Sequence, residues 1–245
     1  MNELNQLIAH VHVPKTAGTA INAFLFKSLG AGQDHVQAMI DDPVALRQSV
    51  RQMGWVAGHV PAPKFRDRLT KIGVSARWIT ALREPIEQVV SHYNWLIEIG
   101  HRGETFFKGH PPAIQQIHHR IATSDNNDPR VVMQNIEAHA GLFLNCQARY
   151  VVGPEFARPE VSYAAALDTF DAVIFSNDVA AGLSGLFPMS EGASEHSNVS
   201  PYRFDRDVFK DPRLRRFLLD RNRADEALWA VARERVHAVR RSVEA

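Results

Sequence analysis

The sequence predicts an α/β fold, a three-layer α/β/α arrangement around a central, mostly parallel sheet. Short apolar segments bounded by turn residues alternate with longer segments of helical periodicity, which is the pattern of strand–helix–strand units. The chain has 245 residues and 45% hydrophobic composition, enough for a sizeable core. We therefore expect residues 1–245 to form a single domain.

The first strand–helix unit lies near the N-terminus. An apolar run over residues 7–13 predicts a buried strand, which stops at Pro14. Apolar residues such as Ile21 and Leu25 then recur at helical spacing, and Gly30 is a helix stop signal. The opening unit is thus a strand, a tight loop and a helix.

Three later segments predict further buried strands, at residues 54–60, 76–82 and 172–176. The strand–helix transition repeats after the second of them, because Pro85 suits the first turn of a helix. Helical segments are predicted at 136–150, 178–187 and 213–242.

Residues 100–130 are rich in His, Gly, Pro, Asn and Asp and have weak periodicity. We expect loops and short helices there, forming an insertion or lid on the acceptor side of a site.

Charge and cysteine content restrict the class of protein. Lys and Arg number 28 against 27 acidic residues, so the net charge of +1 gives no case for a nucleic-acid or membrane partner. The lone cysteine and the lack of an evident signal segment favour the cytoplasm. No apolar stretch approaches the roughly 20 residues of a membrane-spanning helix. The oligomeric state has no sequence signal.

The segment PKTAGT, residues 14–19, is a candidate anion-binding loop. Between a strand and a helix, several backbone N–H groups can converge on one phosphate. Lys15 adds a positive charge, Gly18 permits close approach, and the hydroxyls of Thr16 and Thr19 can cap the helix or bond the anion. A tight turn with a capping threonine is the alternative interpretation. The order differs from GxxxxGK[ST] of nucleotide-triphosphate loops.

A second candidate anion site follows the strand at 76–82. Arg83 ends that strand, and ligands of open α/β sheets gather at the carboxyl ends of strands. Ser91 lies in the second turn of the next helix. With Gln88 and His92 it shares the face opposite the apolar stripe, which could line a cleft.

The ordered pair PKTAGT and ALREPIEQVVSHYNWL resembles the sulfotransferase superfamily, in particular its carbohydrate branch, which includes heparan sulfate 2-O-sulfotransferase. The resemblance implies a P-loop-like fold and 3′-phosphoadenosine 5′-phosphosulfate (PAPS) as co-substrate, with 3′-phosphoadenosine 5′-phosphate as product. The implied contacts of the 5′-phosphosulfate are Lys15, Thr16, Ala17, Gly18, Thr19 and Ala20. Those of the 3′-phosphate are Arg83 and Ser91. A nucleotide-closing loop is implied at Asn198, Ser200 and Arg203.

Weaker similarities extend over most of the chain: GHV at 58–60, NCQARYVVG at 145–153 and NVSPYR at 198–203. Three residues depart from the family pattern, one of them Ala57, which stands where the heparan enzyme has another histidine before its GHV. Glu84 replaces an aspartate that often follows the arginine, and Gln88 stands where many relatives have a second arginine.

Sulfuryl transfer requires alignment of donor and acceptor oxygens and stabilisation of the leaving phosphate. We assign the second task to Lys15. His59 is the candidate base that takes the proton of the acceptor hydroxyl, with His92 and His12 as alternatives. We expect no metal, because the chain has one cysteine and no HExxH pattern. The expected acceptor is a hydroxylated molecule such as a glycan.

Two other functions remain open from the sequence. A small-molecule kinase of the P-loop class shares the strand–loop–helix arrangement. A non-catalytic module could keep the nucleotide pocket without the base.

Overall fold

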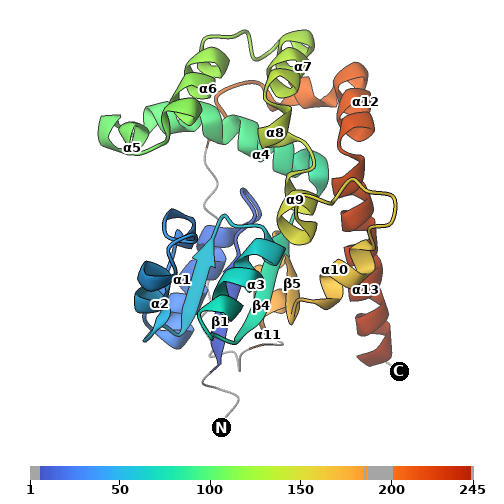
Figure 1. Ribbon diagram of the computed structural model, residues 1–245. Helices are drawn as coiled ribbons and strands as arrows, with labels where there is room; N and C mark the ends of the chain where they lie inside the picture. The colour runs from blue at the N-terminus through green and yellow to red at the C-terminus, as the bar shows by residue number, and fades with distance from the viewer. Residues whose placement is uncertain (1–5, 185, 187–200, 244–245) are drawn as a thin grey trace. The chain divides into compact units, whose positions relative to one another are not determined.

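The computed structural model describes residues 6–184, 186 and 201–243, with the backbone alone at 237–243 (Figure 1). Contacts divide the chain into two compact units. Unit 1 consists of Met1–Arg83, Gln147–Ser197 and Ala227–Ala245, and unit 2 of Glu84–Cys146 and Asn198–Glu226. The description of 1–245 as a single domain stays a prediction.

Unit 1 contains a parallel five-stranded sheet with the strand order β2-β3-β1-β4-β5. The strands are β1 (Leu7–Val11), β2 (Gly32–Gln33), β3 (Trp55–Gly58), β4 (Ala76–Leu82) and β5 (Ala172–Phe175). The predicted α/β class with a parallel sheet is therefore confirmed. The sequence missed β2, because a two-residue strand has too few positions to show alternation.

The helices that lie wholly or mostly in unit 1 surround this sheet. They are α1 (Gly18–Leu29), η2 (Val36–Ala38), α2 (Pro43–Val50), α3 (Ala62–Lys71), α9 (Cys146–Val152), α10 (Tyr163–Asp168), α11 (Val179–Ser184) and α13 (Arg223–Val243). The predicted helix at 136–150 is broken into separate segments, and the one at 213–242 is interrupted at Asn222.

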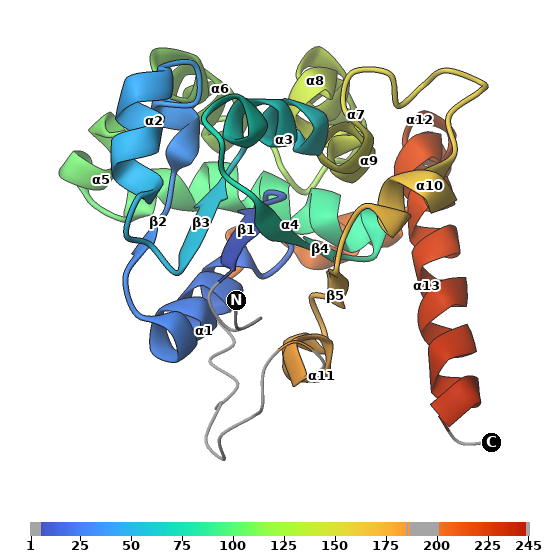
Figure 2. The ribbon, with the colours of Figure 1, turned by 60° about the horizontal axis from the view of Figure 1, so that its bottom comes forward.

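Strand alternation determines which helices cover each face of the sheet. On one face, buried residues such as Ile8 and Ile79 form a core with Ile21 of α1 and Leu183 of α11. On the other, the Trp78 ring of β4 contacts a buried phenylalanine of α3 with centroids 5.3 Å apart. Figure 2 shows α1 and α11 on the opposite side of the sheet from α3. The result is a three-layer α/β/α arrangement.

Unit 2 is helical. Its elements are α4 (Pro85–Glu98), η3 (Ile99–His101), α5 (Glu104–Lys108), α6 (Pro112–Ala122), α7 (Pro129–Ala138), α8 (Ala140–Phe143), η4 (Arg206–Lys210) and α12 (Pro212–Arg221). Tyr93 is fully buried in its core, and its hydroxyl donates to Asn126 at 2.6 Å. Burial raises the pKa of this phenol to about 12. Short helices occupy most of residues 100–130, whereas the role of a lid stays a prediction.

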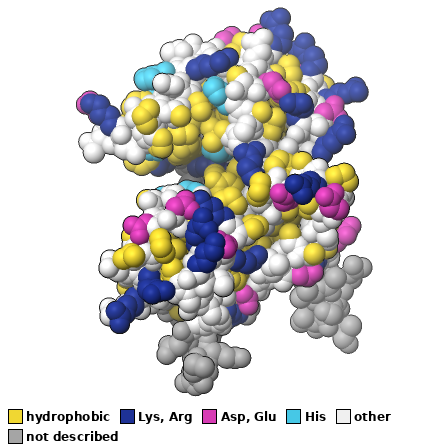
Figure 3. All heavy atoms as spheres, in the orientation of Figure 1, with side chains coloured by type: hydrophobic (Ala, Val, Ile, Leu, Met, Phe, Trp, Pro, Cys, Tyr) yellow, Lys and Arg dark blue, Asp and Glu magenta, His cyan; other side chains and the backbone are white. Residues whose placement is uncertain are grey.

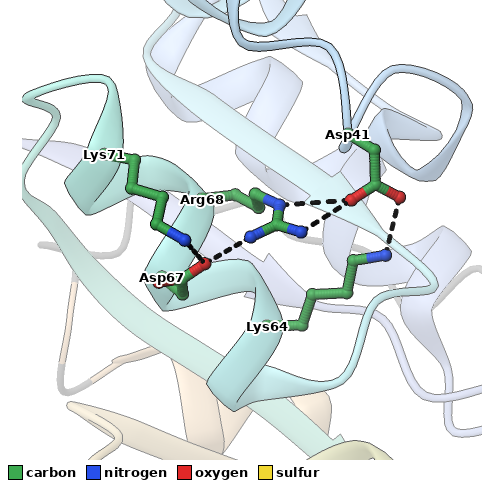
Figure 4. A network of polar contacts seen from close by, with 5 residues as sticks. All are labelled: Asp41, Lys64, Asp67, Arg68 and Lys71. Atoms are coloured by element: carbon green, nitrogen blue, oxygen red, sulfur yellow. Dashed lines mark hydrogen bonds and ion pairs between the residues drawn. The ribbon is translucent and has the colours of Figure 1, made fainter.

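A network of ion pairs lies on the surface of unit 1 (Figure 4). Asp41 accepts from Lys64 at 2.7 Å and from Arg68 at 2.9 Å, and Asp67 accepts from Lys71 at 2.9 Å. The network joins α3 to the loop before α2.

On the face drawn in Figure 3, basic and acidic side chains are interspersed. This part of the surface therefore lacks a large field of one sign.

None of the helices in the described part of the chain is long and apolar enough to cross a membrane.

Candidate functional site

The candidate site of unit 1 lies at the carboxyl ends of its three central strands. The chain leaves β1 toward β2 at one edge of the sheet, but leaves β4 toward β5 at the other edge. Because β1 and β4 are neighbours, this is a topological switch point, where open α/β sheets bind ligands. The PKTAGT loop follows β1, His59 follows β3 and Arg83 follows β4. The fold brings these three predicted features to one edge.

The backbone of the loop is held in an unusual conformation. Lys15 has φ 66° and Ala17 has φ 71°, although neither residue is glycine. The left-handed region costs a residue with a side chain about 1 kcal/mol or more, and such strain concentrates at functional sites. Two residues at positive φ within three positions therefore indicate that this loop has a functional role besides connecting β1 to α1.

Helix α1 begins without a side-chain cap. Its N-cap is Ala17, and no acidic residue lies in its first turn. The sequence hypothesis that a threonine caps this helix is therefore wrong. The buried Thr16 hydroxyl instead donates to the Val13 carbonyl at 3.0 Å, and Thr19 is exposed. The Thr16 hydroxyl thus stabilises the turn, and its single proton is already used in this arrangement, so only the Thr16 backbone N–H is left to donate to an anion.

Four successive backbone N–H groups at this helix start have no acceptor among the described residues: Thr16, Ala17, Gly18 and Thr19. The first bonds that continue the helix come from the N–H groups of Ala20 and Ile21, both to the Ala17 carbonyl. Unsatisfied N–H groups and the helix dipole together give this end a partial positive charge. The arrangement suits an anion with several oxygen atoms.

Gly18 is required by the packing below the loop. A Cβ placed on Gly18 would lie 2.0 Å from Nε2 of His12. The ring of His12 is buried, so it cannot move aside at low cost. The glycine allows the start of α1 to lie directly against this histidine.

His59 is fixed at two points. Its Nδ1 lies 2.7 Å from the carbonyl oxygen of His12, and its backbone N–H donates to the Gln37 side chain at 3.0 Å. A carbonyl only accepts, so Nδ1 of His59 carries the proton and Nε2 is the basic nitrogen. Burial lowers the pKa of His59. The ring is therefore neutral at pH 7, as a base must be.

His59 ends a row of histidine rings that the sequence did not reveal. The His10 and His12 rings stack with centroids 5.2 Å apart, and those of His12 and His59 are 4.3 Å apart. Burial lowers the pKa of His10 to about 4 and that of His12 to about 2. These rings are neutral at pH 7. The described residues contain no group of three or more His, Cys, Asp or Glu placed to hold a metal ion.

Arg83 is held by Gln147 of α9. Its backbone N–H donates to Gln147 Oε1 at 2.8 Å, and its carbonyl accepts from Gln147 Nε2 at 2.8 Å. The guanidinium Nη1 lies 3.5 Å from the Lys15 carbonyl oxygen. The structure therefore brings Arg83 to the PKTAGT loop. The sequence singled out the segment that contains Gln147, but not this residue, because a clamp between distant segments has no local signal.

Other predicted site residues belong to unit 2. Ser91 is partly exposed on α4, whereas His92 and Gln88 are buried. That this face lines a cleft stays a prediction. The Arg203 guanidinium pairs with the buried Glu98, and its backbone N–H donates to Asn94. A phosphate bound by Arg203 would therefore share the guanidinium with Glu98.

Asn198 and Ser200 lie outside the described residues. Their assignment to a closing loop stays a prediction.

Glu84, which departs from the family pattern, caps helix α4. Its carboxylate accepts from the backbone N–H of Glu87 at 2.6 Å. An acidic residue after the arginine thus has a structural explanation that needs no ligand.

A scan against the known protein families finds no match to this chain, and a search of curated proteins finds none either.

Proposed function

We propose that the protein is a sulfotransferase that moves a sulfuryl group from PAPS to a hydroxyl of a carbohydrate or another small acceptor. The observation that carries this proposal is the uncapped start of α1, where four N–H groups without a described acceptor adjoin Lys15 at a switch point of the sheet. The donor brings an activated sulfuryl group. The chain supplies the cradle for its phosphate.

The reaction exchanges one S–O bond for another. The acceptor oxygen forms a bond to sulfur, while the bond between sulfur and the bridging phosphate oxygen breaks. The hydroxyl proton goes to Nε2 of His59, which its Nδ1 contact with the His12 carbonyl leaves free to accept it. Lys15 and the loop N–H groups stabilise the charge that develops on the leaving phosphate.

Arg83 is the proposed contact of the 3′-phosphate in unit 1. Gln147 fixes its backbone from both sides, and its guanidinium lies at the Lys15 carbonyl. A guanidinium held in this way suits an anion with paired oxygens. Ser91, Asn198, Ser200 and Arg203 keep the nucleotide-binding roles that the family resemblance implies. The cytoplasm is the proposed location, since the lone cysteine fits a reducing compartment.

Thermal unfolding with a set of nucleotides tests this proposal. We expect 3′-phosphoadenosine 5′-phosphate at about 100 times its dissociation constant to raise the melting temperature by several degrees. Adenosine 5′-phosphosulfate, which lacks the 3′-phosphate, should stabilise less. Stabilisation by ATP with magnesium but not by PAPS would instead indicate a small-molecule kinase.

Turnover separates an enzyme from a binding module. With ³⁵S-labelled PAPS and a panel of glycans and alcohols, we expect label on an acceptor and release of the 3′,5′-bisphosphate product. Nucleotide binding that does not require His59 or His92, without transfer to any acceptor, would indicate a non-catalytic module. Absence of both binding and stabilisation would overturn the sulfotransferase proposal.

A further inference from the structure

His12 packs against the PKTAGT loop, and one nitrogen of its ring has no hydrogen-bond partner in the described part of the chain. The side chain is 9% exposed, and its Nδ1 is buried without a hydrogen-bond partner in the described part of the chain. Its other nitrogen, Nε2, faces the start of α1, since a Cβ on Gly18 would lie 2.0 Å from it. One side of the ring therefore faces the protein interior and the other faces the anion cradle.

The two nitrogens have unequal costs of protonation. A buried N–H without an acceptor is rare in proteins, whereas an unused acceptor is tolerated more often. A proton on Nδ1 of His12 would create such an orphan donor, so the proton belongs on Nε2. Burial, aided by neighbouring His10 and His59, lowers the pKa of His12 to about 2, and the ring is neutral. His12 thus carries a single N–H, on the side of the loop.

A purely structural role would not require a histidine here. The ring stacks on His10 and contacts the ring of His59 at 4.3 Å between centroids. A phenylalanine would fill the same space without a buried, unpartnered nitrogen. The charged or titratable groups around His12 are His10 on its own strand, His59 after β3, His35 before η2 and Lys15 in the loop. None of them forms a hydrogen bond with the His12 ring among the described residues.

We infer that Nε2–H of His12 is a binding contact of the anion held by the PKTAGT loop, a neutral side-chain donor added to the backbone N–H groups of Thr16 to Thr19. The inference deepens the proposed function, and rests on it only in that the loop binds a phosphate or phosphosulfate. It also assigns His12 a role other than that of the base. A neutral donor adds a hydrogen bond without another positive charge beside His59.

Nitrogen-15 NMR of the histidine rings of the full chain tests the contact. Pyrophosphate and 3′-phosphoadenosine 5′-phosphate are the two probes, at pH 7. We expect the free protein to show His12 as the Nε2–H tautomer, and both probes to shift the Nε2–H proton downfield. The Nδ1–H tautomer, or an unchanged His12 signal at saturation, would overturn the inference.

Two substitutions distinguish a role of His12 as a hydrogen-bond donor from a role in which its ring only fills space. His12→Phe keeps the ring but removes the donor, and we expect it to weaken pyrophosphate binding about 10-fold or more, since a hydrogen bond to a charged group is lost. His12→Gln keeps an N–H near the Nε2 position, and we expect affinity within about threefold of the wild type. The opposite order would show a packing role and overturn the inference.

The two probes also distinguish the inference from the proposed function. Pyrophosphate binding that shifts His12, without binding of PAPS, would support the His12 contact and reject the sulfotransferase. If neither probe binds at the loop, the His12 contact fails as well. Melting temperatures of both variants show whether each is folded when its affinity is measured.

Discussion

Helices α1 of unit 1 and α4 of unit 2 are each the next element after a parallel strand, yet their N-termini differ. At α4 the Glu84 carboxylate accepts from the Glu87 N–H, and the acidic Glu87 lies in the first turn. At α1 the N-cap is Ala17 in a left-handed conformation, with no side-chain cap and no acidic residue in the first turn. Helix α4 thus has a carboxylate of the chain at its positive N-terminus. The N-terminus of α1 has none, and its first N–H groups have no acceptor among the described residues.

The difference indicates which helix start is built for a ligand. A capped N-terminus gains stability of about 1 kcal/mol, and the chain forgoes this at α1 while it also holds Lys15 and Ala17 at positive φ. An anion bound at the start of α1 would compensate for both the missing cap and the strained backbone, because it accepts from the open N–H groups. The α4 end needs no such partner, because Glu84 already caps it.

We expect the most severe loss of turnover from His59→Asn, in the site beside α1. The Asn Nδ2 can still donate to the His12 carbonyl, but the basic Nε2 is lost. We expect turnover to fall by about 10² to 10⁴. Exposed His101 provides the control, and His101→Asn should leave turnover unchanged.

The pH profile of the wild type gives a second measure of the same role. His59 must be neutral to act, and burial lowers its pKa below 6.5. We therefore expect kcat/KM to rise with pH to an apparent pKa below 6.5 and to stay level above it. A profile that His59→Asn leaves unaltered would assign the proton transfer to another group.

Lys15→Ala is expected to have the next largest effect, a loss of about 10² to 10³ in turnover, because one stabilising contact of the leaving phosphate disappears. Lys71→Ala on α3 is the matched control. Its side chain is 62% exposed and pairs with Asp67 on the surface (Figure 4). Equal turnover of the two variants would remove Lys15 from the reaction.

Gly18→Ala tests the close packing of the loop on His12. A methyl group 2.0 Å from a buried ring atom forces the backbone to shift, with an expected loss of about 1–3 kcal/mol in the free energy of unfolding. Gly141→Ala in α8 meets nothing within 4 Å and should gain up to about 1 kcal/mol. Denaturant unfolding of both variants measures the two changes. Changes of the same sign would contradict this description of the loop.

The smallest effect is expected at the capped helix. Glu84→Ala removes the acceptor of the Glu87 N–H, and we expect a loss of about 1 kcal/mol, again from denaturant unfolding. Thr19→Ala, in the first turn of the uncapped helix, should change stability less, because its hydroxyl caps nothing. A larger loss at Thr19 would reverse the comparison between the two helix ends.

The sequence predicted those parts of the fold that strong local patterns determine. The bounds of β4 and the start of α4 at Pro85 agree with the structure, since apolar runs and proline are local signals. Helices α2 and α3 were not predicted, and α6 was expected only as part of a region of loops and short helices, although Ile114, Ile117 and Ile121 have helical spacing.

The candidate site was predictable only in its outline. PKTAGT and Arg83 were recognisable as motifs, and the strand order places them at one edge. The positive φ of Lys15 and Ala17 was not predictable, because residue types that avoid this region give no sign of adopting it. Gln147 and Arg83 are 64 positions apart, so no local pattern encodes their contact. The contact of His12 with Gly18 depends on how the PKTAGT loop turns, which the residue types do not show.

The most direct test of the anion cradle is a backbone amide NMR titration of the full chain with 3′-phosphoadenosine 5′-phosphate. We expect large, saturable shifts of the Thr16, Ala17, Gly18 and Thr19 amide signals, and a much smaller shift of the Glu87 amide at the capped start of α4. Unchanged loop signals at saturating nucleotide would contradict the proposed anion cradle.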